Sequence, residues 1–168
     1  MLDSKCLTEL KEYIDSHYSS PGRPAKFSIK YEKRISLNNI EDSELETYIN
    51  SKQKPFFNQT LLGLIDKKGV PDSQIYKKAG IDRRHFSKIR SNTDYHPSKN
   101  TVIALAIALE LNKNDTDFLL KSAGYSLSNS VTFDLIIQFF VEKERYDMHD
   151  INEALSIFSI NPLIETAD

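Results

Sequence analysis

Apolar residues recur at intervals of three and four positions along most of this chain, which is the spacing of amphipathic helices. Between residues 55 and 125 the pattern divides into five short helices, separated by glycines, prolines and polar residues. These expected helices cover residues 57–68, 71–80, 82–91, 98–111 and 114–124. The fourth is apolar on nearly every side, so we expect it at the centre of the hydrophobic core.

Capping residues mark the expected ends of these helices. The predicted N-caps are Asp72 or Ser73 for the second helix, Asp82 for the third, Ser98 for the fourth, and Asn114 or Asp115 for the fifth. Glycine suits the left-handed conformation in which many helices terminate. We therefore expect helix ends at Gly69, Gly80 and Gly124.

The flanking segments follow a similar spacing. A stripe of Leu2, Cys6, Leu7, Leu10 and Ile14 predicts a helix that stops near Tyr18, before SSPGRP. Residues 27–31 alternate apolar and polar side chains like a half-buried strand, and an extended arm on the core or on another subunit fits equally well. Residues 42–51 predict a short helix. After residue 131, two further helices are expected to fold back on each other, the second capped by Asp147.

The sequence thus predicts an all-α fold with a five-helix core, an N-terminal helix and extended arm, and a C-terminal helical hairpin. The expected segments are residues 1–54, residues 55–125, and residues 126–168, the last packed on the core or used for dimerisation. The apolar stripe from Phe133 to Phe140 fits a core or a dimer contact.

The formal net charge of −2 conceals a segregation of charge along the chain. Residues 1–54 hold nine basic and nine acidic side chains, residues 55–125 hold eleven and seven, and residues 126–168 hold two and eight. Six of the fifteen residues in KKAGIDRRHFSKIRS, residues 77–91, are Lys or Arg. Such a cluster attracts polyanions even on a nearly neutral protein, although a solvated helix face has the same composition.

A helical wheel of residues 82–91 separates this charge from the apolar residues. Phe86 and Ile89 fall on one side, while Arg84, Ser87 and Lys88 fall on the other. The donors of Arg and Lys match phosphate oxygens and the acceptor edge of guanine. With the short helix before it and a turn at Gly80, this segment has the spacing of a helix-turn-helix.

The stretches DSQIYKKAGIDRRHFSKIRS and HPSKNTVIALAIALELN resemble the lambda-repressor-like, or Cro/XRE, DNA-binding domains over about residues 57–125. The resemblance implies five packed helices, of which the third enters the major groove of DNA. It places Arg83, Arg84, Ser87 and Lys88 where the family contacts bases. It places Ser73, Lys77, Ser91, Asn92, Tyr95 and Lys99 where the family contacts phosphates, although Tyr95 packed on the loop is an equal alternative.

The resemblance implies a sequence-specific DNA-binding protein, most simply a repressor-like transcriptional regulator of bacterial or phage type. Its partner would be double-stranded DNA, bound as a homodimer through the hairpin of residues 131–158 or the N-terminal arm. The alternative is an adaptor or inhibitor that binds another protein. Two departures from the family pattern favour it: Asp72 stands where many members have glutamine, and Tyr76 where they have alanine.

The sequence favours neither catalysis nor a bound metal or other cofactor. The four histidines stand far apart, the five glycines form no phosphate-binding loop, and Cys6 is the only cysteine. The longest apolar run, Val102–Leu109, is far shorter than the ~20 residues of a membrane-spanning helix. The first residues do not resemble a signal peptide, so we expect a cytoplasmic protein without membrane contact.

Overall fold

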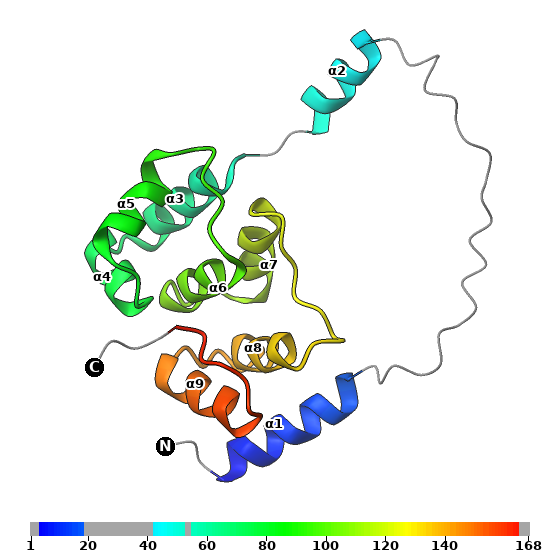
Figure 1. Ribbon diagram of the computed structural model, residues 1–168, viewed down its shortest axis with the longest axis vertical. Coiled ribbons are helices and arrows are strands. Elements are labelled where there is room, and N and C mark those ends of the chain that lie inside the picture. Colours follow the sequence, from blue (N-terminus) through cyan, green and yellow to red (C-terminus); the bar gives the residue numbers. More distant parts are fainter. Residues whose placement is uncertain (1–3, 19–41, 53–54, 165–168) are drawn as a thin grey trace, which may run out of the picture.

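The computed structural model describes residues 4–18, 42–52 and 55–164, and within these ranges all regular structure is helical (Figure 1). The helices are α1 Ser4–His17, α2 Asp42–Lys52, α3 Phe57–Lys68, α4 Asp72–Lys78, α5 Arg83–Ser91, α6 Lys99–Ala108, α7 Lys113–Ser122, α8 Thr132–Glu142 and α9 Met148–Ile157. In Figure 1, α3 to α7 form an upper group, α8, α9 and α1 form a lower group, and α2 lies apart. The expected strand at residues 27–31 lies outside the described residues. None of the described helices combines the length and the apolar character that crossing a bilayer requires.

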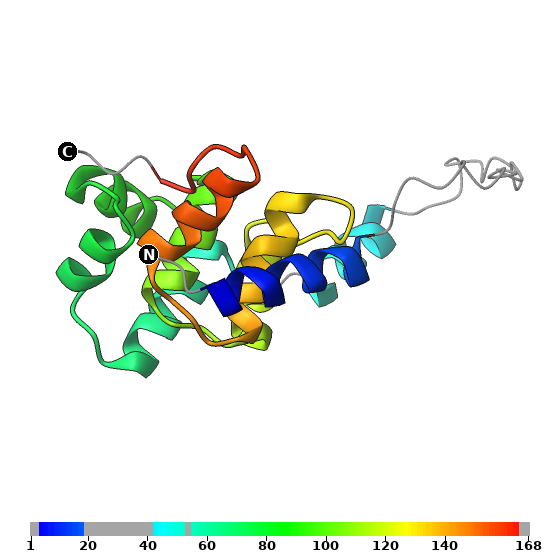
Figure 2. The same cartoon turned by 90° about the horizontal axis from the view of Figure 1, so that it is seen from below.

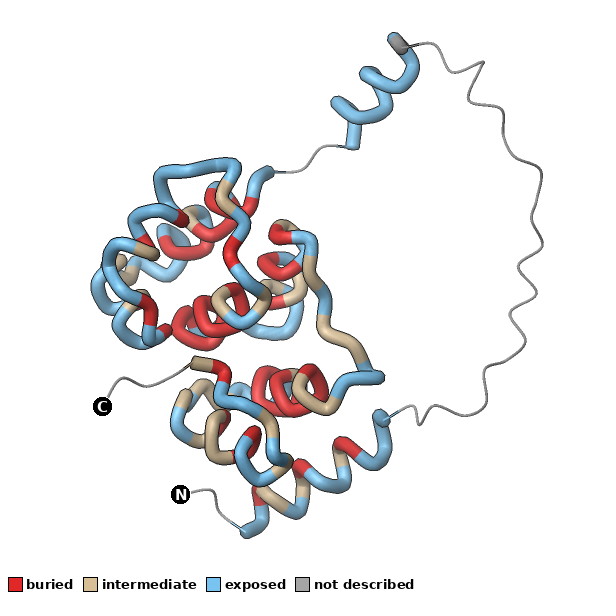
Figure 3. Tube along the Cα trace, in the orientation of Figure 1, coloured by how far each residue is buried: buried red, intermediate tan, exposed pale blue. Residues whose placement is uncertain are grey.

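Helix α6 is the buried centre of the upper group, as the sequence predicts. Every residue from Val102 to Ala108 is buried, and the burial trace of Figure 3 shows most of α6 in red. Helices α4 and α7 pack on α6, and α3 contacts both α7 and α5. Each surrounding helix therefore buries one face and leaves the other to solvent.

The caps at Asp82, Ser98 and Asp147 are confirmed. Asp82 Oδ1 accepts hydrogen bonds from the backbone amides of Arg84 and His85, at 2.8 and 2.9 Å. Ser98 Oγ accepts from the Thr101 amide at 3.3 Å. These side chains satisfy backbone donors that have no partner within their own helix.

Two predicted caps are wrong. The N-cap of α4 is Pro71, whose extended backbone leads straight into the helix, and neither Asp72 nor Ser73 caps it. The N-cap of α7 is Asn112, which accepts from the Asp115 amide at 2.9 Å, in place of Asn114 or Asp115. The chain reaches Asn112 early because α6 ends at Ala108, three residues short of the expected end, and Glu110 turns left-handed with φ +50°.

In the lower group the N-terminal helix α1 and the C-terminal helix α9 both pack against α8. Of the predicted N-terminal stripe, Cys6, Leu10 and Ile14 are buried, Leu7 is half-buried, and Leu2 lies outside the described residues. Helix α1 packs along α8 (Figure 2). Tyr13 meets Phe139 edge-on, with ring centroids 5.5 Å apart. Helices α8 and α9 fold back on each other as expected. The apolar residues of α8 from Leu135 to Ile137 and from Phe139 to Val141 are all buried within this one chain.

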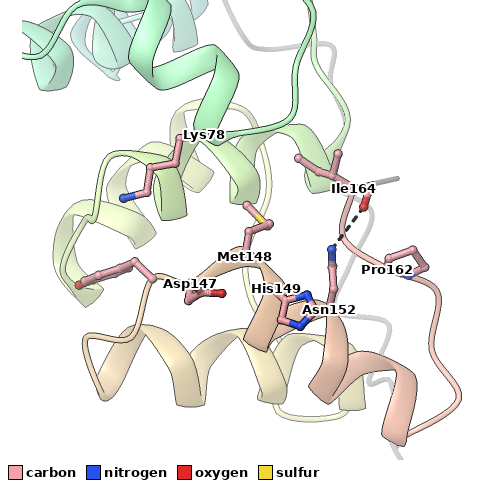
Figure 4. Close-up of a pocket in the computed structure, with 8 residues that line it drawn as sticks. Lys78, Asp147, Met148, His149, Asn152, Pro162 and Ile164 are labelled. Atoms are coloured by element: carbon pink, nitrogen blue, oxygen red, sulfur yellow. Dashed lines mark hydrogen bonds between the residues drawn. The ribbon is translucent and has the colours of Figure 1, made fainter. Parts of the chain in front are cut away.

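A short C-terminal segment returns to the upper group. Asn152 on α9 holds it through two hydrogen bonds: its Oδ1 accepts from the Leu163 amide at 2.9 Å, and its Nδ2 donates to the Ile164 carbonyl at 3.4 Å (Figure 4). Leu163 is buried. Ile164 packs so closely on Gly80 that a Cβ atom there would lie 2.7 Å from its Cγ2. The end of the described chain therefore rests on the turn between α4 and α5.

Glu142 links α8 to both α7 and α1. It accepts a hydrogen bond from the Tyr13 hydroxyl at 2.9 Å and forms an ion pair with Lys113. Burial raises the pKa of Glu142, but the hydrogen bonds from Lys113 and Tyr13 together lower it below its ordinary value. Burial and the bond to Glu142 raise the pKa of Tyr13. The ionised carboxylate is the form that this network stabilises.

We expect Gly80→Ala to destabilise the fold more than Gly69→Ala. Both glycines have positive φ, +63° and +65°, so a side chain costs about 1–2 kcal/mol of backbone strain at either position. Only at Gly80 does the added Cβ also collide with Ile164, while Gly69 has open space. Urea unfolding of both variants measures the difference. In an Ile164→Ala background, Gly80→Ala should lower the free energy of unfolding no more than Gly69→Ala does. Equal losses for the two glycine substitutions in the wild-type background would contradict the packing of Ile164 on Gly80.

We expect Glu142→Gln to lower the free energy of unfolding near neutral pH. A carboxyl group with a lowered pKa stabilises the folded state above its ordinary pKa of 4.5, and this contribution is lost as pH falls through the lowered value. The stability difference between the wild type and the variant should therefore shrink on acidification. Urea titrations over a pH series measure it, and a difference that stays constant would show that the charge of Glu142 plays no part.

Candidate nucleic-acid interface

Helix α5 is anchored by its apolar side. Phe86 and Ile89 are buried, as predicted, and Phe86 meets the ring of Tyr76 on α4 at a centroid distance of 5.8 Å. The C-cap of α4 is Ala79, and it is followed by Gly80, with φ +63°, and the buried Ile81. The Ile81 amide donates to the Tyr76 carbonyl at 2.8 Å, which closes the turn. Two short helices are thereby joined by a tight connection, and the outer face of α5 is left exposed.

The outer face of α5 carries two arginines that form no ion pair with the described residues. Arg83 and Arg84 are exposed, and neither forms an ion pair with any residue that the structure describes. Ser87, one turn further along, is also exposed. The ionised N-cap Asp82 lies near them, and backbone hydrogen bonds from His85 and Arg84 lower its pKa. The positive charge of Arg84 also contributes to this lower pKa, but neither guanidinium group forms an ion pair with Asp82, so both can donate to an external anion.

Lys88 is directed towards the loop that follows α5. Its ammonium lies 4.4 Å from the centroid of the Tyr95 ring, a distance typical of a cation–π contact. The Tyr95 hydroxyl shares a hydrogen bond of 3.0 Å with His85 Nε2. Tyr95 is half-buried and has both its ring and its hydroxyl engaged, which matches the packed alternative for this residue better than a phosphate contact.

Three other cations are paired with carboxylates, two of them within residues 77–91 and the third, Lys99, beyond that stretch. Arg90 pairs with Asp72, which brings the first turn of α4 beside the last turn of α5. Lys78 pairs with Glu110, and the hydrogen bond from Lys78 lowers the pKa of Glu110. Asp72 thus neutralises a neighbouring arginine. The positive charge that faces solvent is smaller than the composition of residues 77–91 suggests.

Lys99 forms the most enclosed of these pairs. Its Nζ donates to both oxygens of Asp134, at 2.7 and 2.6 Å, and Asp134 is only 1% exposed. The Ser128 amide donates to the same carboxylate at 2.8 Å. The ammonium therefore points from the start of α6 to α8. To contact a phosphate, Lys99 would have to break its ion pair with the buried Asp134.

The remaining predicted contacts lie on exposed backbone or helix positions. Ser73 and Lys77 stand four residues apart on α4, so they share one face of that helix. Ser91 ends α5, and Asn92 is its C-cap. The Asn92 side chain accepts from the Asp94 amide at 3.0 Å and shapes the loop. The Arg90–Asp72 pair places the first turn of α4, which carries Ser73, beside the last turn of α5, which carries Ser91.

A cavity of about 670 Å³ opens between the end of α4 and α9 (Figure 4). Its polar side chains are largely committed to the protein itself. Lys78 pairs with Glu110, Asp147 caps α9, and Asn152 holds the C-terminal segment. This crevice therefore offers little for ligand recognition. Within the described part of the chain, no group of three or more His, Cys, Asp or Glu side chains could hold a metal ion.

Comparison of the chain with protein-family models, with curated proteins and with solved structures finds no match.

The sequence alone did not identify the acidic partners of Lys78 and Lys99. Glu110 and Asp134 are 32 and 35 residues from the lysines that they bind, so no local spacing connects them. One signal was present for Asp134. It is the only charged residue in TFDLIIQFF, an otherwise apolar stretch, and a buried carboxylate needs a counter-charge.

We expect Lys99→Met to lower the free energy of unfolding by about 3 kcal/mol, because it leaves the carboxylate of Asp134 buried without its cation. Urea unfolding measures this loss. Lys77→Met removes an exposed lysine and should change stability by less than about 0.5 kcal/mol. Adding Asp134→Asn to Lys99→Met should recover most of the stability, since an amide can still accept from Ser128. A loss no greater than that of Lys77→Met would contradict the buried pair.

Proposed function

We propose that this chain is a sequence-specific DNA-binding protein of the helix-turn-helix type, most simply a repressor-like transcriptional regulator. In this proposal α4 and α5 form the helix-turn-helix, and α5 enters the major groove. The order of α3 to α7, the buried α6 and the turn at Gly80 support the lambda-repressor-like arrangement that the sequence resembles.

The observation that carries the proposal is the pair of exposed arginines on the outer face of α5. Most other cations nearby are bound by carboxylates or by an aromatic ring, whereas Arg83 and Arg84 form no ion pair with any described residue. A guanidinium group can donate two parallel hydrogen bonds to guanine or to a phosphate. Phe86 and Ile89 hold the helix from behind, so the position of both arginines relative to DNA would be fixed by a packed core.

The proposed site residues fall into two classes. Arg83, Arg84 and Ser87 would reach base edges, and Lys88 would reach them after it leaves the ring of Tyr95. Ser73, Lys77, Ser91 and Asn92 would contact phosphates, which supply affinity and register but no sequence information. In this proposal Lys99 holds the start of α6 to α8 and Tyr95 holds the loop to α5, because their polar groups are engaged within the protein.

The second candidate function is recognition of another protein by the same helices. The ion pairs Arg90–Asp72 and Lys99–Asp134 favour it, because they reduce the positive field that a DNA-binding surface needs. Selection of binding sites from a random duplex pool separates the two. A DNA reader enriches one sequence and loses affinity steeply as salt is raised, whereas a protein-binding module enriches none.

We expect Arg84→Ala to weaken binding to the selected duplex by about 1–3 kcal/mol, because a contact to a base edge is lost. Fluorescence anisotropy at fixed salt measures the affinity. Lys121→Ala, an exposed change of the same charge on α7, should have little effect. Arg84→Lys should restore the charge but not the full affinity, since an ammonium group lacks the paired donors. Unchanged affinity in Arg84→Ala would remove α5 from the interface.

A further inference from the structure

Helix α2 carries an apolar face that no described part of the chain covers. Leu45, Tyr48 and Ile49 stand at the i, i+3 and i+4 positions of one side, and they are 49%, 62% and 50% exposed. The other large apolar residues with comparable exposure are single residues on separate elements: Tyr18, Phe56, Phe118, Val131 and Ile157. In Figure 1 α2 stands away from both groups of helices.

A helix of this kind is not stable by itself. Isolated helices shorter than about 12–15 residues are marginal in water, and most helical stability comes from packing of the apolar face. Helix α2 has 11 residues. On the opposite side of α2, the Thr47 hydroxyl donates a hydrogen bond to the Ser43 carbonyl at 2.7 Å, so this hydroxyl already has a partner within the helix. The apolar side is thus the one that needs a partner.

The C-terminal hairpin has no such unsatisfied face. Six apolar residues of α8 are buried within one chain by α1, α9 and the upper group, as are Ile151, Ala154 and Leu155 of α9. Among the exposed large apolar side chains of the described residues, the three on α2 are therefore the ones that share a single helix face.

We propose that α2 is a self-association element, which pairs antiparallel with α2 of a second copy of this chain. The charges of the helix fit such a partner. Glu44 lies in its first turn and Lys52 in its last, and neither forms an ion pair with another described residue. Antiparallel pairing about a twofold axis brings Glu44 of each copy towards Lys52 of the other, twice in one interface. Tyr48 lies close to the axis, and the two helix dipoles oppose each other favourably.

The proposed interface is small, so the dimer is weak. Three apolar side chains from each copy cover far less than the roughly 800 Å² per partner of a stable complex. We expect a dissociation constant between about 10 µM and 1 mM for the free protein. The proposal does not depend on DNA binding, although a weak twofold dimer would suit a palindromic site.

Sedimentation equilibrium of the full chain without DNA tests the proposal. Leu45→Glu should weaken the dimer at least about tenfold, because it places a charge in the apolar face. Asn50→Glu introduces the same charge on the opposite side of α2 and should weaken it by less than about threefold. A protein that stays monomeric up to about 1 mM overturns the proposal, as does a dimer that both substitutions affect equally.

An exchange of charges identifies the partner as a second copy. Glu44→Lys and Lys52→Glu should each weaken the dimer about two- to fivefold, and the double variant should return to the affinity of the wild type. The double variant is expected to regain the affinity of the wild type only if residue 44 of one copy meets residue 52 of the other across a symmetric, antiparallel interface. A double variant that is weaker than both single variants overturns the antiparallel pairing.

Disulfide formation gives an independent readout. Tyr48→Cys should form a cross-linked dimer under mild oxidation, whereas Asn50→Cys should not, and the buried Cys6 is common to both. Equal cross-linking of the two variants overturns the proposal. A chain that reads DNA but remains a monomer overturns this proposal alone, and a dimer that ignores DNA overturns only the proposed function.

Discussion

The burial of α6 constrains the rest of the structure. A helix that is apolar on nearly every side must be covered on every side, and the residues from Val102 to Ala108 are all buried. Helices α4 and α7 cover it directly, while α3 connects α7 to α5. Each of them needs only one apolar face for this task. The outer face of α5 is therefore under no packing constraint, and Arg83 and Arg84 can occupy it without cost to the core.

The ion pairs determine which of the Lys and Arg side chains near α4 and α5 can bind an external anion. Exposed ion pairs contribute only about 0–1 kcal/mol to stability, so Arg90–Asp72 and Lys78–Glu110 could exchange their partners for a phosphate. Lys99–Asp134 differs, because Asp134 is buried and its carboxylate would be left without a cation. An external anion can therefore bind Arg90 or Lys78 in place of their carboxylate partners, whereas Lys99 stays bound to Asp134.

Local features of the structure could be predicted from the sequence, and long-range ones could not. The helices, the buried Phe86 and Ile89 and the caps at Asp82 and Ser98 depend on residues a few positions apart. The caps of α4 and α7 were mispredicted because several capping residues stand in a row there, and the end of the preceding segment decides between them. The packing of α1 on α8 joins residues more than a hundred positions apart, as the Tyr13–Glu142 hydrogen bond shows. Periodicity identifies an apolar face but not what covers it.

The same limit applies to the candidate site, where the C-terminal residues contribute more than their sequence indicates. Asp134 on α8 holds the start of α6, and Ile164 packs on Gly80 in the turn before α5. Two separate contacts therefore join the lower group of helices to the elements that position Arg83 and Arg84. Because packed interiors transmit displacement rather than absorb it, a shift of α9 or of the C-terminal segment would be felt at the turn. The orientation of α5 thus depends on the C-terminal helices and segment as well as on residues 55–125.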